Sequence, residues 1–247
     1  MLDAKELGAL ESRCRAVPLT EYEYIATDFV VALLETVMDY QNPRTTVQRA
    51  TKHFEDDRWD EIRTLDDLER VLARFPAERD GNDELAQYLW GYHHWRRAQE
   101  LRGLVAYFRE RNITDLAALK AWAVASTTGD FVGHIKGLGT AVYHGLVMRL
   151  GVETVKPDVH ILRFVSDAIG RPVNELEAVE SLEEVAKRLD LSPACWTGRS
   201  GSTSDPCAHD ERRHAARLRR SARAARKACH PGSPLTPPPA WVADEPW

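Results

Sequence analysis

Apolar residues recur at spacings of three and four positions through most of residues 21–191, which is the pattern of amphipathic helices and not of strands. The first clear run is residues 21–40, and Asn42-Pro43 ends it. Pro43 also suits the first turn of a second helix that continues through Phe54. We therefore predict an all-α fold.

The same spacing predicts further helices, separated by residues that favour helix ends. Thr64 with Asp67, and Thr114 with Asp115, have the residue types that cap the start of a helix, and Gly151 suits a helix end. The expected helices cover residues 64–75, 96–111, 141–150, 155–169 and 181–191.

Two glycines, Gly137 and Gly139, bracket one apolar residue between two runs of helical pattern. They suit a tight hairpin over residues 135–139, whose backbone can approach another molecule because no side chain blocks its amides. A helix that starts at Thr140 would direct its free N–H groups and the positive end of its dipole out of this hairpin. The pattern predicts a helix-hairpin-helix with an anion site suited to a phosphate.

An aspartate follows one helix later, because Pro157 and Asp158 are residue types that favour the first positions of a helix. The hairpin Ile-Lys-Gly-Leu-Gly at residues 135–139 and this Pro-Asp-Val-His start resemble the helix-hairpin-helix (HhH-GPD) DNA glycosylases of base-excision repair, the superfamily of endonuclease III. The resemblance covers residues 24–170. It implies a DNA-repair N-glycosylase that acts on double-stranded DNA and removes a damaged or mismatched base.

The resemblance also implies roles for individual residues. Asp158 is the catalytic carboxylate, which stabilises the cation-like sugar and orients or deprotonates the attacking water. Gln41 is the polar residue that enters the gap left by an extruded base. For both Asp158 and Gln41, the alternative is that the residue only caps a helix. The DNA backbone is contacted by Lys136, Gly137, Leu138, Gly139, Thr140, Ala141 and Arg163.

Two departures from the family restrict the chemistry. Bifunctional members carry a nucleophilic lysine just after the hairpin, and this position is Ala141, so water is the implied nucleophile of a monofunctional enzyme. The cysteines lack the close spacing of an iron–sulfur cluster. We expect no such cluster, no metal held by side chains, and no cofactor besides a monovalent cation on the hairpin backbone. The cysteines are Cys14, Cys195, Cys207 and Cys229.

Aromatic residues offer a base pocket. Tyr40, Trp90 and Tyr92 would suit stacking on an extruded, electron-poor alkylated purine. Aromatic residues at helical spacing more often belong to a core, and both interpretations stay open. His160, within a turn of Asp158, either assists catalysis or is structural.

The formal net charge of −5 counts against a nucleic-acid binder. Because residues 192–247 carry nine Lys/Arg and five Asp/Glu, the remainder of the chain carries −9. We expect the acidic runs to lie away from a DNA face formed by Lys136, Arg149, Lys156 and Arg163. No apolar run reaches membrane length and no signal-peptide core is present. We expect a soluble, cytoplasmic monomer associated with a bacterial nucleoid and with no membrane partner.

Residues 192–247 have little helical periodicity and are predicted to be disordered. One interpretation is a basic arm that grips DNA. The other is a frameshift near Pro193, because residues 194–203 can be encoded by codons whose neighbouring frame reads Leu-Leu-Asp-Trp-Ala-Ile-Trp-Glu-Tyr, a string with helical spacing.

The predicted architecture is a glycosylase-like fold over residues 1–191, with two helical lobes and a cleft between them. Residues 43–151 form the central lobe with the hairpin, and residues 1–42 with 152–191 form the second; Asp158 is expected to face the cleft. A degenerate or non-catalytic DNA-binding protein, and a helical protein with no DNA role, are the alternatives. Salt-dependent duplex binding and base release distinguish the three.

Overall fold

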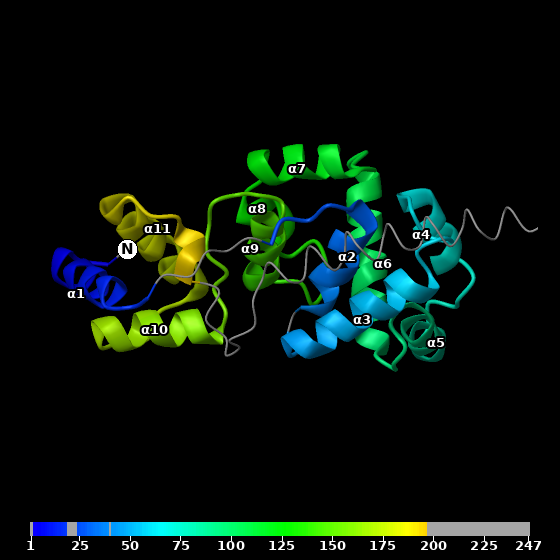
Figure 1. The fold of residues 1–247 in the computed structure, drawn as a ribbon, viewed down its shortest axis with the longest axis horizontal. Helices are drawn as coiled ribbons and strands as arrows, with labels where there is room; N and C mark the ends of the chain where they lie inside the picture. Colours follow the sequence, from blue (N-terminus) through cyan, green and yellow to red (C-terminus); the bar gives the residue numbers. More distant parts are fainter. Residues whose placement is uncertain (1, 19–23, 40, 197–247) are drawn as a thin grey trace, which may run out of the picture. The chain divides into compact units, whose positions relative to one another are not determined.

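The computed structural model describes residues 2–18, 24–39 and 41–196. Within these residues every regular element is a helix, which confirms the all-α prediction. The described helices lie in the unit Met1–Gly201; Tyr40 and the tail from residue 197 lie outside the described residues, as do the predictions made for them. Figure 1 shows, in chain order, α1 Ala4–Arg15, α2 Phe29–Met38, α3 Arg44–Asp57, α4 Leu65–Leu72, α5 Arg79–Trp90, α6 Trp95–Glu110, α7 Leu116–Ala125, α8 Thr128–Phe131, α9 Thr140–Arg149, α10 Val159–Ile169, α11 Glu175–Leu189 and the 3₁₀ helix η1 Pro193–Trp196.

Helix α2 is the centre of the larger hydrophobic core. All ten of its residues are buried, and it packs against α3, α4, α6 and α9. The helix begins at Phe29 and does not include the described residues 24–28, because the Asp28 side chain accepts a hydrogen bond from the Val31 amide at 3.0 Å and caps the helix there. Before the cap, the Ala26 amide donates to the Arg149 carbonyl at 2.7 Å, which ties this segment to the end of α9.

The larger core runs from Ala26 to Leu150 and therefore includes α2. The prediction that residues 1–42 belong to the second lobe is wrong for this helix. The physical reason is its sequence, FVVALLETVM, which is apolar around most of its circumference and needs neighbours on all sides.

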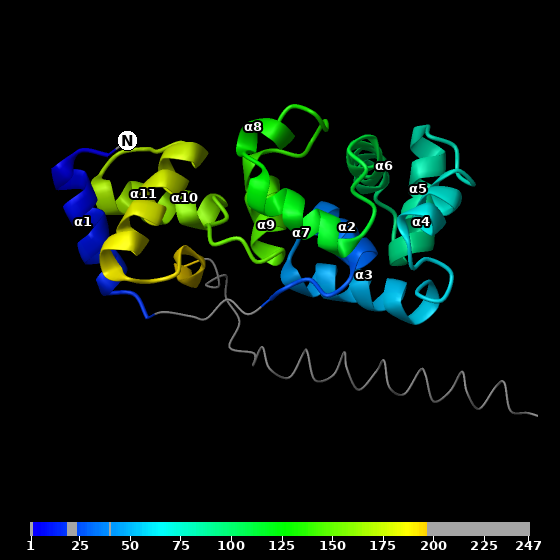
Figure 2. The same ribbon diagram turned by 90° about the horizontal axis from the view of Figure 1, so that it is seen from above.

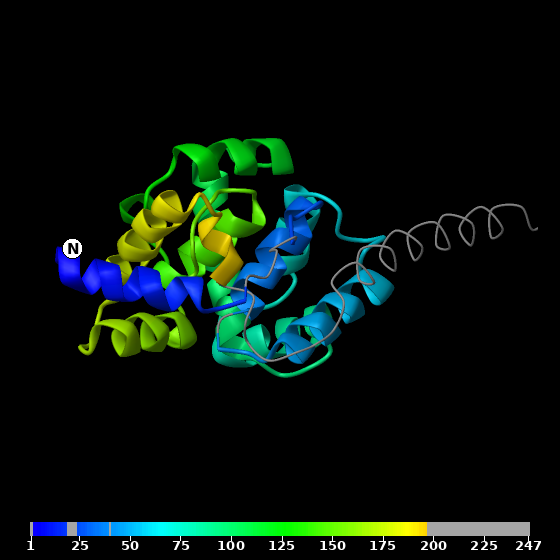
Figure 3. The ribbon, with the colours of Figure 1, turned by 60° about the vertical axis from the view of Figure 1, so that its left-hand side comes forward.

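A second, smaller hydrophobic core joins α1, α10, α11 and η1, which pack around one another (Figure 3). Helix α1 was not predicted; its start is fixed by a capping box in which Asp3 and Glu6 bond to each other's backbone amides. Helix α11 begins at Glu175 instead of residue 181, because the Asn174 side chain accepts from the Glu177 amide at 2.9 Å. Prediction of disorder from residue 192 does not hold for η1, whose Trp196 is buried in this core.

A chain of hydrogen bonds links the two cores. His144 of α9 bonds through Nδ1 to Thr154 Oγ1 at 2.9 Å, and Thr154 donates to Glu183 of α11 at 2.7 Å. Thr154 lies in the segment between α9 and α10, four positions before Asp158. The segment that carries Asp158 is thereby attached to a helix from each core.

Candidate nucleic-acid interface and pocket

The hairpin predicted over residues 135–139 is present, between the short helix α8 and helix α9. Its turn is closed by a hydrogen bond from the Leu138 amide to the Ile135 carbonyl at 3.2 Å, and Gly137 has φ of 96°. The side chains of Ile135 and Leu138 are buried, whereas Lys136 and both glycines of the hairpin are exposed. Because Leu138 as a whole residue is 2% exposed, its side chain is not available to contact DNA.

The hairpin is docked on helix α6 at two points. A Cβ atom on Gly137 would lie 2.5 Å from Glu100 Oε1, and one on Gly103 would lie 2.8 Å from Ile135 Cγ2. The absence of side chains at these two glycines allows the close approach. Gly139 differs, since a Cβ there would meet no atom within 4 Å. Gly137 thus allows the hairpin to pack on α6, and Gly139 leaves the outer face of the turn open.

The amides at the start of α9 face out of this hairpin. Gly139 is the N-cap and offers no side chain to the helix. The first backbone bond of the helix is donated by Val142 to the Gly139 carbonyl at 3.1 Å, so the amides of Thr140 and Ala141 precede the helical ladder. Both residues are partly exposed. These donors, with the positive end of the helix dipole, suit an anion.

The acidic runs of the sequence belong to separate helices. They lie at the end of α3, on α4 and on α11, while Figure 2 shows α8 and α9 between α4 on one side and α11 on the other. Lys136 in the hairpin and Arg163 on α10 are exposed.

Asp158 is the N-cap of α10. Its Oδ1 accepts from the amides of His160 at 2.9 Å and Ile161 at 3.0 Å. Within the described part of the chain, Oδ2 accepts no hydrogen bond, and the residue is only partly buried. One carboxylate oxygen thus fixes the helix start while the other stays available to a water or ligand. His160 is exposed.

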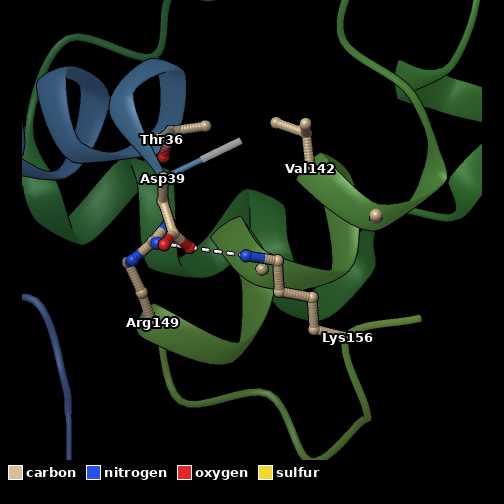
Figure 4. A pocket seen from close by; sticks show the side chains of 7 residues that line it. Thr36, Asp39, Val142, Arg149 and Lys156 are labelled. Carbon is tan, nitrogen blue, oxygen red and sulfur yellow. Dashed lines mark hydrogen bonds and ion pairs between the residues drawn. The ribbon is translucent and has the colours of Figure 1, made fainter. Parts of the chain in front are cut away.

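A small pocket opens beside the first turn of α9 (Figure 4). It combines apolar groups from α9 with polar side chains from the end of α2 and from the segment before α10. The residues that line it are Thr36, Asp39, Ala141, Val142, Gly145, Arg149 and Lys156. The pocket lining therefore includes Ala141 of the hairpin helix. It also includes Lys156, which precedes Asp158 by two positions in the sequence.

One wall of the pocket is an ion cluster. Lys156 Nζ lies 2.7 Å from Asp39 Oδ2, and Arg149 binds the same oxygen. Burial alone would raise the pKa of Asp39, but the charges of Arg149 and Lys156 outweigh that effect and lower this pKa to about 2. The side chains of Arg149 and Lys156 are 8% and 19% exposed. The cluster is thus one carboxylate with two cations.

This cluster corrects the predicted DNA face. Arg149 and Lys156 were assigned to that face with Lys136 and Arg163, but they turn inward to Asp39 because a buried carboxylate requires compensating charge. Sequence reasoning missed Asp39. The sequence feature that could have indicated it is an acidic residue directly after the apolar helix α2. A carboxylate at the end of a buried helix needs a cationic partner.

The aromatic residues predicted to form a base pocket differ in their exposure. Trp90 is 2% exposed and belongs to the larger core, so its prediction as a stacking residue is wrong. The cause is its place in the last turn of α5, whose buried face also carries Leu85, Ala86 and Leu89. Tyr92 is half-buried, and its hydroxyl lies 3.5 Å from the Met38 sulfur, next to Asp39 in sequence. Stacking by Tyr92 stays a prediction.

Gln41 stands at the corner between α2 and α3 in a left-handed conformation. Its φ is 57°, and the residue is exposed. In a residue other than glycine, this conformation costs about 1 kcal/mol of steric strain. Strained backbone conformations of this kind are often found at functional sites. The corner is followed by Asn42, whose side-chain Nδ2 donates to the Met38 carbonyl at 2.7 Å and holds the turn against α2.

The described residues hold no group of three or more His, Cys, Asp or Glu side chains arranged as a metal site. Burial raises the pKa of the Cys14 thiol to about 12. Cys207 and Cys229 lie outside the described residues, so the expectation about an iron–sulfur cluster stays a prediction. No described helix combines the length and the apolar character that crossing a bilayer requires.

Comparison with known proteins gives two matches. A family model described as "Domain of unknown function (DUF8548)" matches residues 7–196. The chain is also similar to the solved "Structure of a Trapped Endonuclease III-DNA Covalent Intermediate: Estranged-Adenine Complex", with a TM-score of 0.52 and 18% identity over 84% of this chain and 92% of that chain. No curated protein matches. At this identity the likeness concerns the fold, and it shows that the described helices are arranged as in endonuclease III.

Proposed function

The chain belongs to the DUF8548 family, and we propose that it is a monofunctional DNA N-glycosylase that hydrolyses the bond between a damaged or mismatched base and its sugar. The observation that carries the proposal is Asp158. Its Oδ1 is occupied by two helix amides while its Oδ2 is open, and it follows pocket-lining Lys156 by two positions. The endonuclease III-like fold supports the same proposal.

Asp158 would act on the sugar. As the base departs, the sugar becomes cation-like, and an ionised carboxylate beside the anomeric carbon stabilises that charge. The open Oδ2 can also orient or deprotonate the attacking water. The two amides on Oδ1 fix the direction of the carboxylate, so no side-chain rearrangement is required during the reaction.

The hairpin would hold the DNA backbone. Exposed Gly139 leaves room for a phosphate at the amides of Thr140 and Ala141, and Lys136 and Arg163 supply exposed positive charge. A monovalent cation on hairpin carbonyls belongs to this proposal. Such contacts position the duplex without reading its sequence, so the choice of base must come from contacts with the base itself, such as that of Gln41.

Single-turnover base release tests the proposal. Duplexes with uracil, alkylpurine, oxidised-purine or mismatch lesions are incubated with the wild type and with Asp158→Asn. Asparagine caps helices as well as aspartate does, so the fold should persist while release from the preferred lesion falls by about 10³-fold. Asp115→Asn, the same change at the N-cap of α7, is the matched control and should release base at the wild-type rate. Equal rates in wild type and Asp158→Asn would refute the proposal.

A non-catalytic DNA-binding protein is the second candidate. It is favoured by one observation: capping of α10 already accounts for an aspartate at position 158. This candidate predicts duplex binding that weakens with salt and no release of any base by the wild type.

A further inference from the structure

Two exposed arginines lie at the starts of helices α5 and α6. Arg79 is the first residue of α5, and Arg96 lies in the first turn of α6. Within the part of the chain that the structure describes, neither forms an ion pair or donates a hydrogen bond. Further along α6 the arginines are engaged, because Arg102 donates to backbone carbonyl groups and Arg109 to Glu69. Arg79 and Arg96 thus keep their N–H donors for a ligand.

The indole ring of Trp95 brings these two arginines together. The Cζ atom of Arg96 lies 5.3 Å from the ring centroid, and that of Arg79 lies 5.6 Å from it. At such distances the negative face of an aromatic ring attracts a cation. Trp95 is partly buried, and the ring therefore holds two positive charges at one place on the surface. We call Arg79, Trp95 and Arg96 the Trp95 cluster.

The carboxylates one helical turn from these arginines have other partners. Asp83, four positions after Arg79, lies 2.6 Å from a histidine of the α5–α6 loop. Glu100, four positions after Arg96, is 12% exposed and lies 2.8 Å from the neighbouring arginine of α6. Neither carboxylate bonds to the Trp95 cluster, so both guanidinium groups present their charge to solvent.

The Trp95 cluster lies on the same side of α6 as the hairpin. Residues four positions apart share a helix face, so Arg96 lies one turn from Glu100. A Cβ atom on Gly137 of the hairpin would lie 2.5 Å from Glu100 Oε1, and Lys136 beside this glycine is exposed. In Figures 1 and 2, α6 lies between α9, which follows the hairpin, and α5, which carries Arg79. Exposed cations therefore continue from the hairpin across the start of α6 to α5.

We infer that the Trp95 cluster is a second contact for duplex DNA, which binds the phosphate backbone beside the segment held by the hairpin. The inference rests on the DNA binding of the proposed function and extends its interface across α6. Guanidinium groups bind phosphate oxygens in pairs, so arginine suits this role. Two guanidinium groups already occupy the Trp95 ring, and the ring therefore supports the cations and does not stack on a base.

The charge of the chain makes such a contact necessary. Outside residues 192–247 the chain carries a net charge of −9, which repels a polyanion. A protein of this charge can bind DNA only where cations without carboxylate partners are gathered on one face. The hairpin contributes one such cation, Lys136, and the Trp95 cluster adds two.

The salt dependence of binding to an undamaged duplex tests the inference. Each phosphate contact adds about 0.9 to the slope of log affinity against log salt concentration. The slope for Arg79→Gln/Arg96→Gln should therefore be smaller than that of the wild type by about 1.8. Arg13→Gln/Lys187→Gln removes two exposed cations from α1 and α11 and is the matched control, with the wild-type slope. Equal slopes for the two double variants overturn the inference.

Substitution of Trp95 separates the positioning of the arginines from their charge. Trp95→Leu keeps both arginines but removes the ring that orients them, and we expect about fivefold weaker binding, as the loss of two cation–π contacts implies. Trp95→Phe retains an aromatic ring and should bind within about twofold of the wild type. Circular dichroism verifies that both variants are folded. Wild-type affinity in folded Trp95→Leu overturns the role of the ring.

These measurements do not depend on catalysis. A reduced slope in Arg79→Gln/Arg96→Gln, with no base released by the wild type from any lesion, would support the interface and refute the proposed glycosylase. Base release by the wild type, with an unchanged slope in the double variant, would overturn the interface alone.

Discussion

His144 Nδ1 lies 2.9 Å from Thr154 Oγ1, and this contact places a proton on Nδ1 of the imidazole. The single hydroxyl proton of Thr154 is donated to Glu183 at 2.7 Å, so Thr154 accepts from His144, which must carry its proton on Nδ1. The other nitrogen, Nε2, lies 3.4 Å from Thr128 Oγ1, which can donate to it. The network therefore suits a neutral histidine with one defined tautomer.

This arrangement predicts acid sensitivity. Burial lowers the pKa of His144 from 6.5 to about 4. Between these pH values the unfolded chain binds a proton that the folded chain does not, so the free energy of unfolding falls as the pH falls through this window. The loss attributable to His144 is about 3 kcal/mol between pH 6.5 and pH 4. Urea denaturation at intervals of half a pH unit measures it.

His144→Gln isolates the contribution of this histidine, because glutamine does not titrate. The variant should be less stable at pH 7, yet lose less stability than the wild type between pH 6.5 and pH 4. Identical slopes for the two proteins would show that His144 is not the responsible group. Asp39 acts in a different window, because its depressed pKa affects stability only below about pH 4.

The two hairpin glycines should respond differently to alanine. Gly137→Ala places a side chain at φ of 96° and 2.5 Å from Glu100 Oε1, and we expect a loss of about 2 kcal/mol in the free energy of unfolding. Position 139 has a negative φ, and a Cβ atom there would meet no neighbour. The free energy of unfolding of Gly139→Ala should therefore stay within about 0.5 kcal/mol of the wild type. Denaturant unfolding of both variants makes the comparison.

Duplex affinity then separates folding from function in this pair. If the open face at Gly139 admits a phosphate, Gly139→Ala should weaken duplex binding by about tenfold although the protein stays folded. Unchanged affinity in a folded Gly139→Ala protein would contradict the hairpin as the DNA contact.

The parts of the fold that the sequence predicts are those set by local chemistry. The cap at Thr64, the hairpin at Gly137 and the N-cap at Asp158 lie where residue types favour them, and the structure has all three. The pocket was not predictable, because Asp39 and Lys156 are 117 positions apart and no local pattern signals their pairing. For the same reason Trp90 was misplaced, since periodicity cannot separate a helix face that meets the core from one that meets a ligand.

Substitutions of Gln41 test whether the strained backbone at the α2–α3 corner contributes to base release. Gln41→Gly should be as stable as the wild type or up to about 1 kcal/mol more stable, because glycine adopts φ of 57° without a steric penalty. Gln41→Ala keeps the penalty and should not gain stability. If Gln41 fills the gap left by an extruded base, both variants should release base more slowly. Wild-type rates in both would assign the residue to the turn alone.

The two cations of the pocket should differ in their effect on stability. Arg149→Met removes the partner that is 8% exposed and should cost about 3 kcal/mol, whereas Lys156→Met removes the partner that is 19% exposed and should cost about 1 kcal/mol. Urea denaturation at pH 7 measures both, with exposed Arg163→Met as a control of nearly zero effect. The reverse order would mean that Lys156, and not Arg149, holds the carboxylate.

Borohydride trapping tests the identity of the nucleophile. A lyase forms a Schiff base between a lysine and the sugar, which borohydride reduces to a stable covalent adduct. Ala141 cannot form one, and Lys156, the lysine that lines the pocket, would first have to leave Asp39. We therefore expect base release by the wild type with no trapped adduct and with strand breakage only after alkali. Ala141→Lys puts an amine on the pocket-lining turn of α9 and should yield an adduct, which shows that the assay detects one. An adduct with the wild type that disappears in Lys156→Met would instead make Lys156 the nucleophile, and water would no longer be required.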